Sequence, residues 1–246
     1  MKTIGIIGFG QMGRFIALKL KQDFRLFFFD TSPKIKSAKG IIKTSLKKVA
    51  SCDIIVICVP IRRFEETLHK IKKIVKPGTL ICDICSIKVQ TAKAMLEILP
   101  TNVELIGLHP LFGPQSGANG INGKKIVVCP IRTKNEFKIK TFLEKKGLQV
   151  ILATPDEHDK AMAKTAVLSH FIGRALVELN ITDDRINEPS FEILLQLKNM
   201  LKEDSEELFI DIQTKNKFAS IHRKRFIEKI KDLDKRIEMC NNIKTP

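Results

Sequence analysis

The stretch that decides the fold is Gly8-Phe9-Gly10-Gln11-Met12-Gly13, which follows the apolar run TIGII and opens a helical pattern. In this setting Gly8 permits a tight turn, Gly10 lets the backbone approach a pyrophosphate, and Gly13 lets the helix pack close to its strand. A pyrophosphate there would lie at the positive end of the helix. The stretch therefore predicts a dinucleotide-binding turn, with Gln11 and Met12 also contacting the cofactor.

The run LFFFD ends in Asp30, 17 residues after Gly13. A carboxylate at this place accepts hydrogen bonds from ribose hydroxyls and repels a 2'-phosphate, which favours NAD over NADP. Lys34 and Lys36 lie close in sequence and weaken that preference. The simpler interpretation of Gly8–Gly13 and Asp30 is a glycine turn between strand and helix with a capping aspartate and no bound nucleotide. Two further cofactor contacts are expected where the third core strand ends, at Val59 and Pro60.

Apolar runs and helical patterns alternate through the first part of the chain. We expect strands at 4–7, 26–29, 54–59, 80–84, 104–108, 126–129 and 150–152, and helices at 12–21, 64–74, 89–99 and 134–146. Near-continuous apolar strands separated by helices predict a Rossmann-type, doubly wound and mostly parallel sheet of the α/β class.

Beyond residue 153 only helical patterns follow, at 157–180, 189–202, 205–216 and 218–239, and Thr154-Pro155-Asp156 forms a helix start signal. We therefore expect a dinucleotide-binding domain over 1–153 and a small all-helical domain over 154–246 that contacts substrate. That domain is too small to bury all its apolar faces alone, so we expect a homodimer formed through it.

The composition restricts the function classes. The net charge of +16 is spread over the predicted helices, with one dense cluster, HRKRF at 222–226, and the chain has no Trp or Tyr for base stacking, so we expect no nucleic-acid partner. No apolar run is long enough for a membrane span, and the expected location is the cytoplasm. Cys82 and Cys85 form a CxxC without a second ligand pair, so we expect buried thiols and no metal.

Three segments outside the nucleotide loop carry more specific information. They are DICSIK at 83–88, HPLFGPQSG at 109–117, and HD at 158–159 followed by LSHFIGR at 168–174. Together they resemble the prephenate and arogenate dehydrogenases of tyrosine biosynthesis, and HPLFGPQSG is similar to that family's HPMFGP signature. The resemblance runs from the first strand to ELFIDIQ at 207–213.

The resemblance implies NAD-dependent oxidative decarboxylation of prephenate to 4-hydroxyphenylpyruvate, with His109 accepting the proton of the substrate hydroxyl and Ser86 orienting that histidine. It also implies substrate contacts from His170, Gln115, Ser116 and Arg174. Simpler roles compete with these. His109 could cap the sheet edge, His170 could be a satisfied core histidine, and Lys88 could be a solvated lysine at a helix start as easily as a site residue.

The sequence departs from the family pattern at the position where many members carry an arginine that grips the substrate carboxylate. Met200 stands there, and Glu192 stands eight residues earlier, where some relatives have the arginine. Another cation must then bind that carboxylate, and the candidates are Arg174, Arg185, Lys198 and Lys202.

The choice between prephenate and arogenate turns on a carboxylate that could pair with the ammonium of arogenate. Asn119 and Gln115 are both neutral, which favours prephenate. The alternatives are arogenate itself, another hydroxy-acid dehydrogenase with a Rossmann half and a helical half, and a non-catalytic NAD-sensing or nucleic-acid-binding protein.

Overall fold

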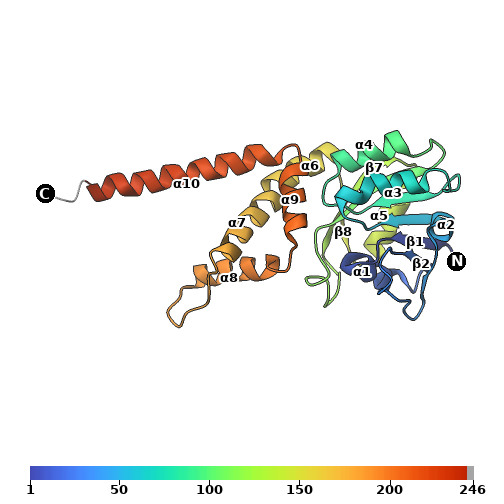
Figure 1. Cartoon of the computed structure of the whole chain (residues 1–246), viewed down its shortest axis with the longest axis horizontal. Coiled ribbons are helices and arrows are strands. Elements are labelled where there is room, and N and C mark those ends of the chain that lie inside the picture. Colours follow the sequence, from blue (N-terminus) through green and yellow to red (C-terminus); the bar gives the residue numbers. More distant parts are fainter. Residues whose placement is uncertain (243–246) are drawn as a thin grey trace. The chain divides into compact units, whose positions relative to one another are not determined.

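The computed structural model describes residues 1–242, and the chain forms two compact units that divide between His158 and Asp159 (Figure 1). The first unit holds one eight-stranded sheet in the order β3-β2-β1-β4-β5-β6-β7-β8. Only β6 and β7 are antiparallel among the neighbouring strands of this sheet. The predicted doubly wound, mostly parallel sheet is confirmed. The strands are β1 Thr3–Ile7, β2 Arg25–Phe29, β3 Ile41–Lys43, β4 Ile54–Ile57, β5 Leu80–Asp83, β6 Glu104–Pro110, β7 Lys125–Arg132 and β8 Gln149–Leu152.

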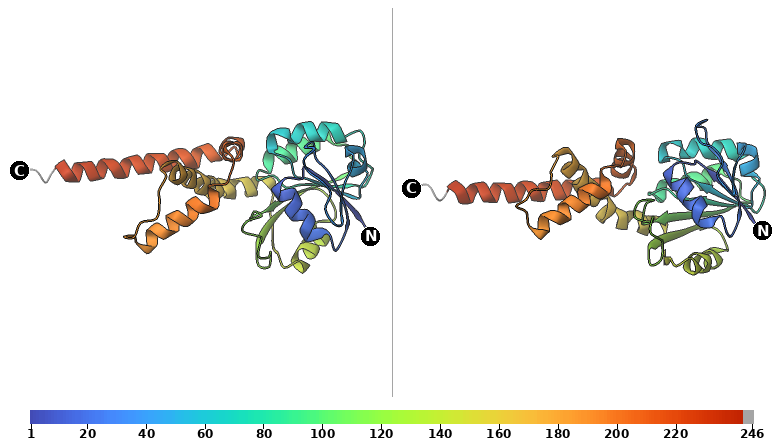
Figure 2. Two further views of the ribbon diagram at one scale, coloured as in Figure 1. Left: turned by 60° about the horizontal axis from the view of Figure 1, so that its bottom comes forward. Right: turned by 90° about the horizontal axis from the view of Figure 1, so that it is seen from below.

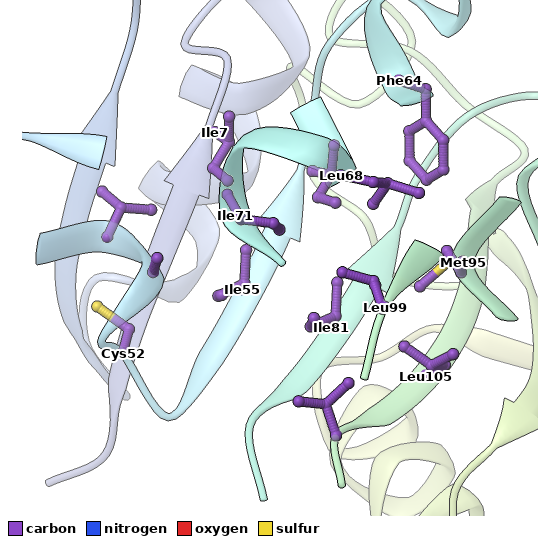
Figure 3. Close-up of a cluster of buried hydrophobic side chains, with 14 of the residues drawn as sticks. Ile7, Cys52, Ile55, Phe64, Leu68, Ile71, Ile81, Met95, Leu99 and Leu105 are labelled. Atoms are coloured by element: carbon purple, nitrogen blue, oxygen red, sulfur yellow. The ribbon is translucent and has the colours of Figure 1, made fainter. Parts of the chain in front are cut away.

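Helices cover both faces of the sheet (Figure 1). They are α1 Gln11–Leu20, α2 Leu46–Ala50, η1 Ile61–Arg63, α3 Phe64–Ile71, α4 Val89–Ile98 and α5 Glu136–Lys145. Figure 3 shows the core on the face covered by α2, α3 and α4, where Ile55, Ile81, Phe64 and Met95 belong to one buried cluster. The opposite face packs against α1 and α5.

Alternate residues of each central strand enter the two cores. Ile55 belongs to one cluster and Val56 to the other, and Ile81 and Cys82 divide in the same way. Successive side chains of a strand point to opposite faces of the sheet, and helices bury both faces. The central strands are therefore apolar at nearly every position. This explains why the strands were recognisable as short apolar runs.

The second unit is helical. It contains α7 Ala166–Glu178, α8 Pro189–Leu201, α9 Glu206–Lys215 and α10 Ala219–Asn242, and α6 Pro155–Lys164 connects it to the sheet unit. Helix α7 approaches α8 closely at Gly173. A Cβ at this position would overlap the side chain of Leu201, so the approach requires glycine. Figure 2 shows that α10 extends well past its neighbours in this unit. Within residues 1–242, no helix combines the length and apolar character that crossing a membrane requires.

Two sequence expectations were wrong in detail. The predicted single helix over 157–180 is two helices, α6 and α7, because Thr165 leaves helical geometry (φ −110°, ψ −81°) and its hydroxyl donates to the carbonyl of Ala161 at 3.0 Å. The short elements β3 and α2 were not predicted. They have three and five residues, too few to show a hydrophobic period.

Candidate active site

The residues expected to bind the cofactor and to carry the chemistry follow strands that end at one edge of the sheet, whereas His170 and Arg174 lie in the helical unit. Strands β1, β4, β5 and β6 are parallel neighbours, so the segments that follow them open at the same carboxyl edge. These segments carry Gly8, Val59, Ser86 and His109. Ligands of open parallel sheets bind at this edge.

The three glycines of the turn meet different surroundings. Gly8 has φ +90°, and a Cβ there would lie 2.5 Å from the carbonyl oxygen of Cys58. A Cβ on Gly13 would overlap the carbonyl oxygen of Gly8. A Cβ on Gly10 would meet nothing within 4 Å. The first and third glycines are therefore required by the protein's own packing, whereas the second leaves open space at the N-terminus of α1.

Asp30 is tied to the glycine turn. One of its carboxylate oxygens accepts a hydrogen bond from the amide of Phe9 at 2.7 Å, and the other accepts from the amide of Ser32 at 2.8 Å. The ring of Phe9 stacks on Phe28 with centroids 3.8 Å apart, which fastens the turn to β2. The carboxylate is thus held at the end of β2, and each oxygen keeps a second lone pair.

The other predicted cofactor residues line the rim of the same edge. Val59 is half-buried, and its Cγ1 would lie 3.1 Å from a Cβ on Gly8. Pro60 is exposed and precedes η1, while Gln11 is exposed and Met12 half-buried in the first turn of α1. Gln11 and Met12 directly follow Gly10, and Val59 and Pro60 follow β4, the strand next to β1.

His109 lies near the end of β6, opposite Val127 of β7, and its ring contacts a second histidine. Its Nδ1 lies 2.7 Å from Nε2 of His158, and the ring centroids are 4.9 Å apart at 65°. His158 is 2% exposed and sits in the first turn of α6. The sequence predicts no role for His158 of the HD motif, because 49 residues separate it from His109.

The segment after His109 packs on the helix that begins at the glycine turn. A Cβ on Gly117 would lie 2.6 Å from the ring of Phe15 in α1, and Phe15 also meets Phe112 edge-on with centroids 6.2 Å apart. This packing joins the segment that follows His109 to α1, the helix that the glycine turn opens.

Gln115 and Ser116 lie in this segment. Gln115 is exposed. The Ser116 hydroxyl accepts from the amide of Gly113 at 3.0 Å, so it holds its own turn together.

Ser86 is half-buried in the loop between β5 and α4, which a buried ion pair anchors. Lys88 Nζ lies 2.6 Å from a carboxylate oxygen of Asp83, and both side chains are fully buried. The hydroxyl of Thr91 donates to the same oxygen at 2.6 Å, and the amide of Cys85 donates to the other at 2.7 Å. The expectation that Lys88 could be a solvated lysine is therefore wrong, because Asp83 ends β5 inside the fold and draws the ammonium inward.

His170 and Arg174 project from α7 in the helical unit, where both meet Asp204. His170 Nδ1 lies 3.3 Å from the Asp204 carboxylate, and Arg174 donates to the Asp204 carbonyl at 3.2 Å. Arg174 also faces Glu206 at 3.4 Å and lies over the ring of Phe209.

The other candidate cations of this unit differ in exposure. Lys198 donates to the carbonyl of Ile181. Arg185 and Lys202 are exposed, as is Met200 at the family's arginine position.

The CxxC cysteines are buried free thiols, as predicted. Burial raises the pKa of Cys82 to about 12 and raises the pKa of Cys85 well above its ordinary value. Zinc requires thiolates, which these surroundings disfavour.

Comparison with known proteins identifies the family. The model described as "Prephenate dehydrogenase, nucleotide-binding domain" matches residues 26–165, more than half of the 246-residue chain. The chain belongs to the prephenate dehydrogenase family. The glycine turn precedes the range that this family model matches. A second model, described as "TYRAAT1-like, C-terminal domain", matches residues 175–243.

Individual members of the prephenate dehydrogenase family support this assignment. The chain is 26% identical over 237 residues to arogenate dehydrogenase 1, chloroplastic, of Arabidopsis thaliana, covering 91% of this chain and 37% of the relative. It is 29% identical over 253 residues to a probable arogenate/prephenate dehydrogenase of Methanocaldococcus jannaschii, covering 94% and 56%. The chain thus spans about half or less of the length of these two relatives.

A solved structure shares the fold over nearly the whole chain. The prephenate dehydrogenase of Aquifex aeolicus, solved with hydroxyphenyl propionate and NAD+, superposes with a TM-score of 0.77 at 22% identity. The match covers 98% of this chain and 92% of the other.

Proposed function

We propose that this chain catalyses the NAD-dependent oxidative decarboxylation of prephenate to 4-hydroxyphenylpyruvate. The observation that carries the proposal is the packing of Gly117 and Phe112 on Phe15, which joins the segment after His109 to the helix that the glycine turn opens. Membership of the prephenate dehydrogenase family supports the choice of reaction.

The turn fits a dinucleotide. The space beside Gly10 would admit a pyrophosphate at the N-terminus of α1, and the fixed carboxylate of Asp30 would accept hydrogen bonds from a ribose. When bound, NAD supplies the acceptor for a hydride. Repulsion between Asp30 and a 2'-phosphate supports NAD over NADP.

His109 is proposed as the base. As the carbon bearing the hydroxyl loses its hydride, the hydroxyl proton passes to His109 and a carbonyl forms. The bond from the ring to its carboxylate then breaks, carbon dioxide leaves, and the electron pair completes an aromatic phenolate that regains a proton. Because aromatisation drives the reaction, the protein's work is to hold the hydroxyl at His109. Ser86 follows β5, the strand next to β6, and its proposed role is to orient His109 and the nicotinamide end.

The dinucleotide-binding domain expected from the sequence, residues 1–153, holds the dinucleotide in this proposal. Gln115 and Ser116 of that domain contact substrate, and so do His170 and Arg174 of the helical domain, residues 154–246. Among the candidate cations for the substrate carboxylate, we favour Arg185 and Lys202, because their side chains are exposed and have the most freedom to reach it.

We further propose that the chain forms a homodimer through its helical unit. The residues Phe226, Ile230, Leu233 and Ile237 repeat at alternating spacings of four and three along α10, which is the pattern of a helix-pairing seam. Ile230, Leu233 and Ile237 are 50%, 49% and 61% exposed. A partner helix would remove this apolar surface from water. The compartment we propose is the cytoplasm, in keeping with six free cysteines.

Arogenate is the second candidate substrate, favoured by the name of the Arabidopsis relative. Neutral Gln115 and Asn119 favour prephenate, since neither can pair with an ammonium. Steady-state reduction of NAD with each substrate tests the proposal. We expect a higher kcat/KM for prephenate. A higher value for arogenate would reverse the substrate choice, and no reduction with either would refute the function.

A further inference from the structure

We propose that His158 is a positioning residue for His109: its Nε2 accepts the Nδ1–H of His109 and thereby leaves Nε2 of His109 as the base. The proposal rests on the function given above. It gives a role to a buried histidine that is not among the site residues expected from the sequence.

The contact between His109 and His158 requires a hydrogen on one of the two nitrogens. Two ring nitrogens at 2.7 Å form a hydrogen bond only when one of them carries hydrogen and the other offers a lone pair. The pair therefore couples the tautomer of His109 to that of His158. Two arrangements satisfy the distance, and they differ in which ring donates.

Only one arrangement leaves His109 able to act as a base. If His109 donates through Nδ1, its Nε2 carries a lone pair that can take the hydroxyl proton. If His158 donates instead, a neutral His109 carries its hydrogen on Nε2 and has no basic nitrogen for substrate. The function thus selects His158 as acceptor.

The fold holds His158 in place. Its side chain is 2% exposed, and it lies near the start of α6. The helix start is itself secured, because Glu157 accepts from both the amide and the hydroxyl of Thr154 at 2.8 Å. The acceptor is therefore built into a fixed helix end.

The arrangement follows the logic of a catalytic base oriented by a third group. A neutral imidazole brings no negative charge, so its contribution is orientation and choice of tautomer. We expect the loss of His158 to lower kcat by about 10- to 100-fold, less than the loss of His109 itself.

The test compares three substitutions. The oxygen of Gln in His158→Gln reaches close to the place of Nε2 and can accept the same hydrogen bond. The shorter side chain in His158→Asn does not reach it, and His158→Leu has no acceptor. Circular dichroism and NAD affinity identify which variants fold. The Gln and Asn variants both carry an amide and differ in reach, so they form a matched pair if the Leu variant does not fold.

We expect His158→Gln to retain kcat within about threefold, and His158→Asn and His158→Leu to lose about 10- to 100-fold in kcat with NAD affinity unchanged. Equal kcat in the Gln and Asn variants, whether high or low, would overturn the proposal. Nitrogen-15 NMR of labelled histidine gives a readout that needs no turnover. It should show the hydrogen of neutral His109 on Nδ1 in the wild type, whereas hydrogen on Nε2 would overturn the proposal. Absence of wild-type turnover with both substrates would instead refute the proposed function.

Discussion

Separate substitutions of Gly10 and Gly13 by alanine should distinguish the glycine that faces the ligand from the glycine that the protein's own packing requires. In the structure a methyl group at Gly10 meets nothing within 4 Å, whereas one at Gly13 overlaps the carbonyl oxygen of Gly8. Gly10→Ala should therefore fold normally and bind NAD poorly. Gly13→Ala should lose both stability and binding.

The magnitudes follow from these surroundings. Gly10 has φ −69° and ψ −161°, which alanine adopts. The weaker N-cap costs at most about 1 kcal/mol, and the stiffer unfolded chain offsets about 0.4–1 kcal/mol. At Gly13 the overlap is with backbone, and overpacking of this kind costs about 1–3 kcal/mol, or a fall in Tm of roughly 2–12 °C. A methyl in the path of the pyrophosphate should weaken NAD binding at least about tenfold.

Isothermal titration calorimetry with NAD and a thermal unfolding curve for each variant measure both effects. Wild-type NAD affinity in a folded Gly10→Ala protein would show that no phosphate approaches this backbone, and the nucleotide turn would have to be abandoned. A Gly13→Ala protein with unchanged Tm would contradict the packing argument.

Three further substitutions test other parts of the account. Asp30→Asn should weaken NAD more than NADP, because the repulsion of a 2'-phosphate is lost; an unchanged ratio of the two Kd values would argue against a ribose contact. Lys88→Met should lower the free energy of unfolding in urea by about 3–5 kcal/mol by leaving Asp83 buried without its cation, and a loss below about 1 kcal/mol would contradict the ion pair's role. Leu233→Lys should convert the proposed dimer to monomer in sedimentation velocity, while the exposed control Lys235→Glu should not; equal masses for the two variants would exclude this seam.

The sheet and the glycine turn could be predicted because their signals are local. The glycines and the apolar runs lie within short windows, and each strand is apolar because both faces are buried. The break at Thr165 has no glycine or proline to mark it. The three residues of β3 are too few to show a period.

The contacts that define the site could not be predicted in the same way, because they join distant segments. The His109–His158 pair spans 49 residues and depends on where α6 starts relative to β6. Lys88 has the sequence context of a solvated helix start, and only the direction of the Asp83 side chain at the end of β5 explains its burial. Periodicity reports which face of an element is apolar, but not which polar group on another element will meet it.

The central claim is that His109 takes the substrate's hydroxyl proton beside a bound dinucleotide. The most direct test measures the appearance of reduced nicotinamide with prephenate for wild type and His109→Asn, together with the NAD affinity of each. We predict that His109→Asn binds NAD as wild type does and turns over at least about a hundredfold more slowly. Undiminished turnover in this variant would remove His109 from the chemistry.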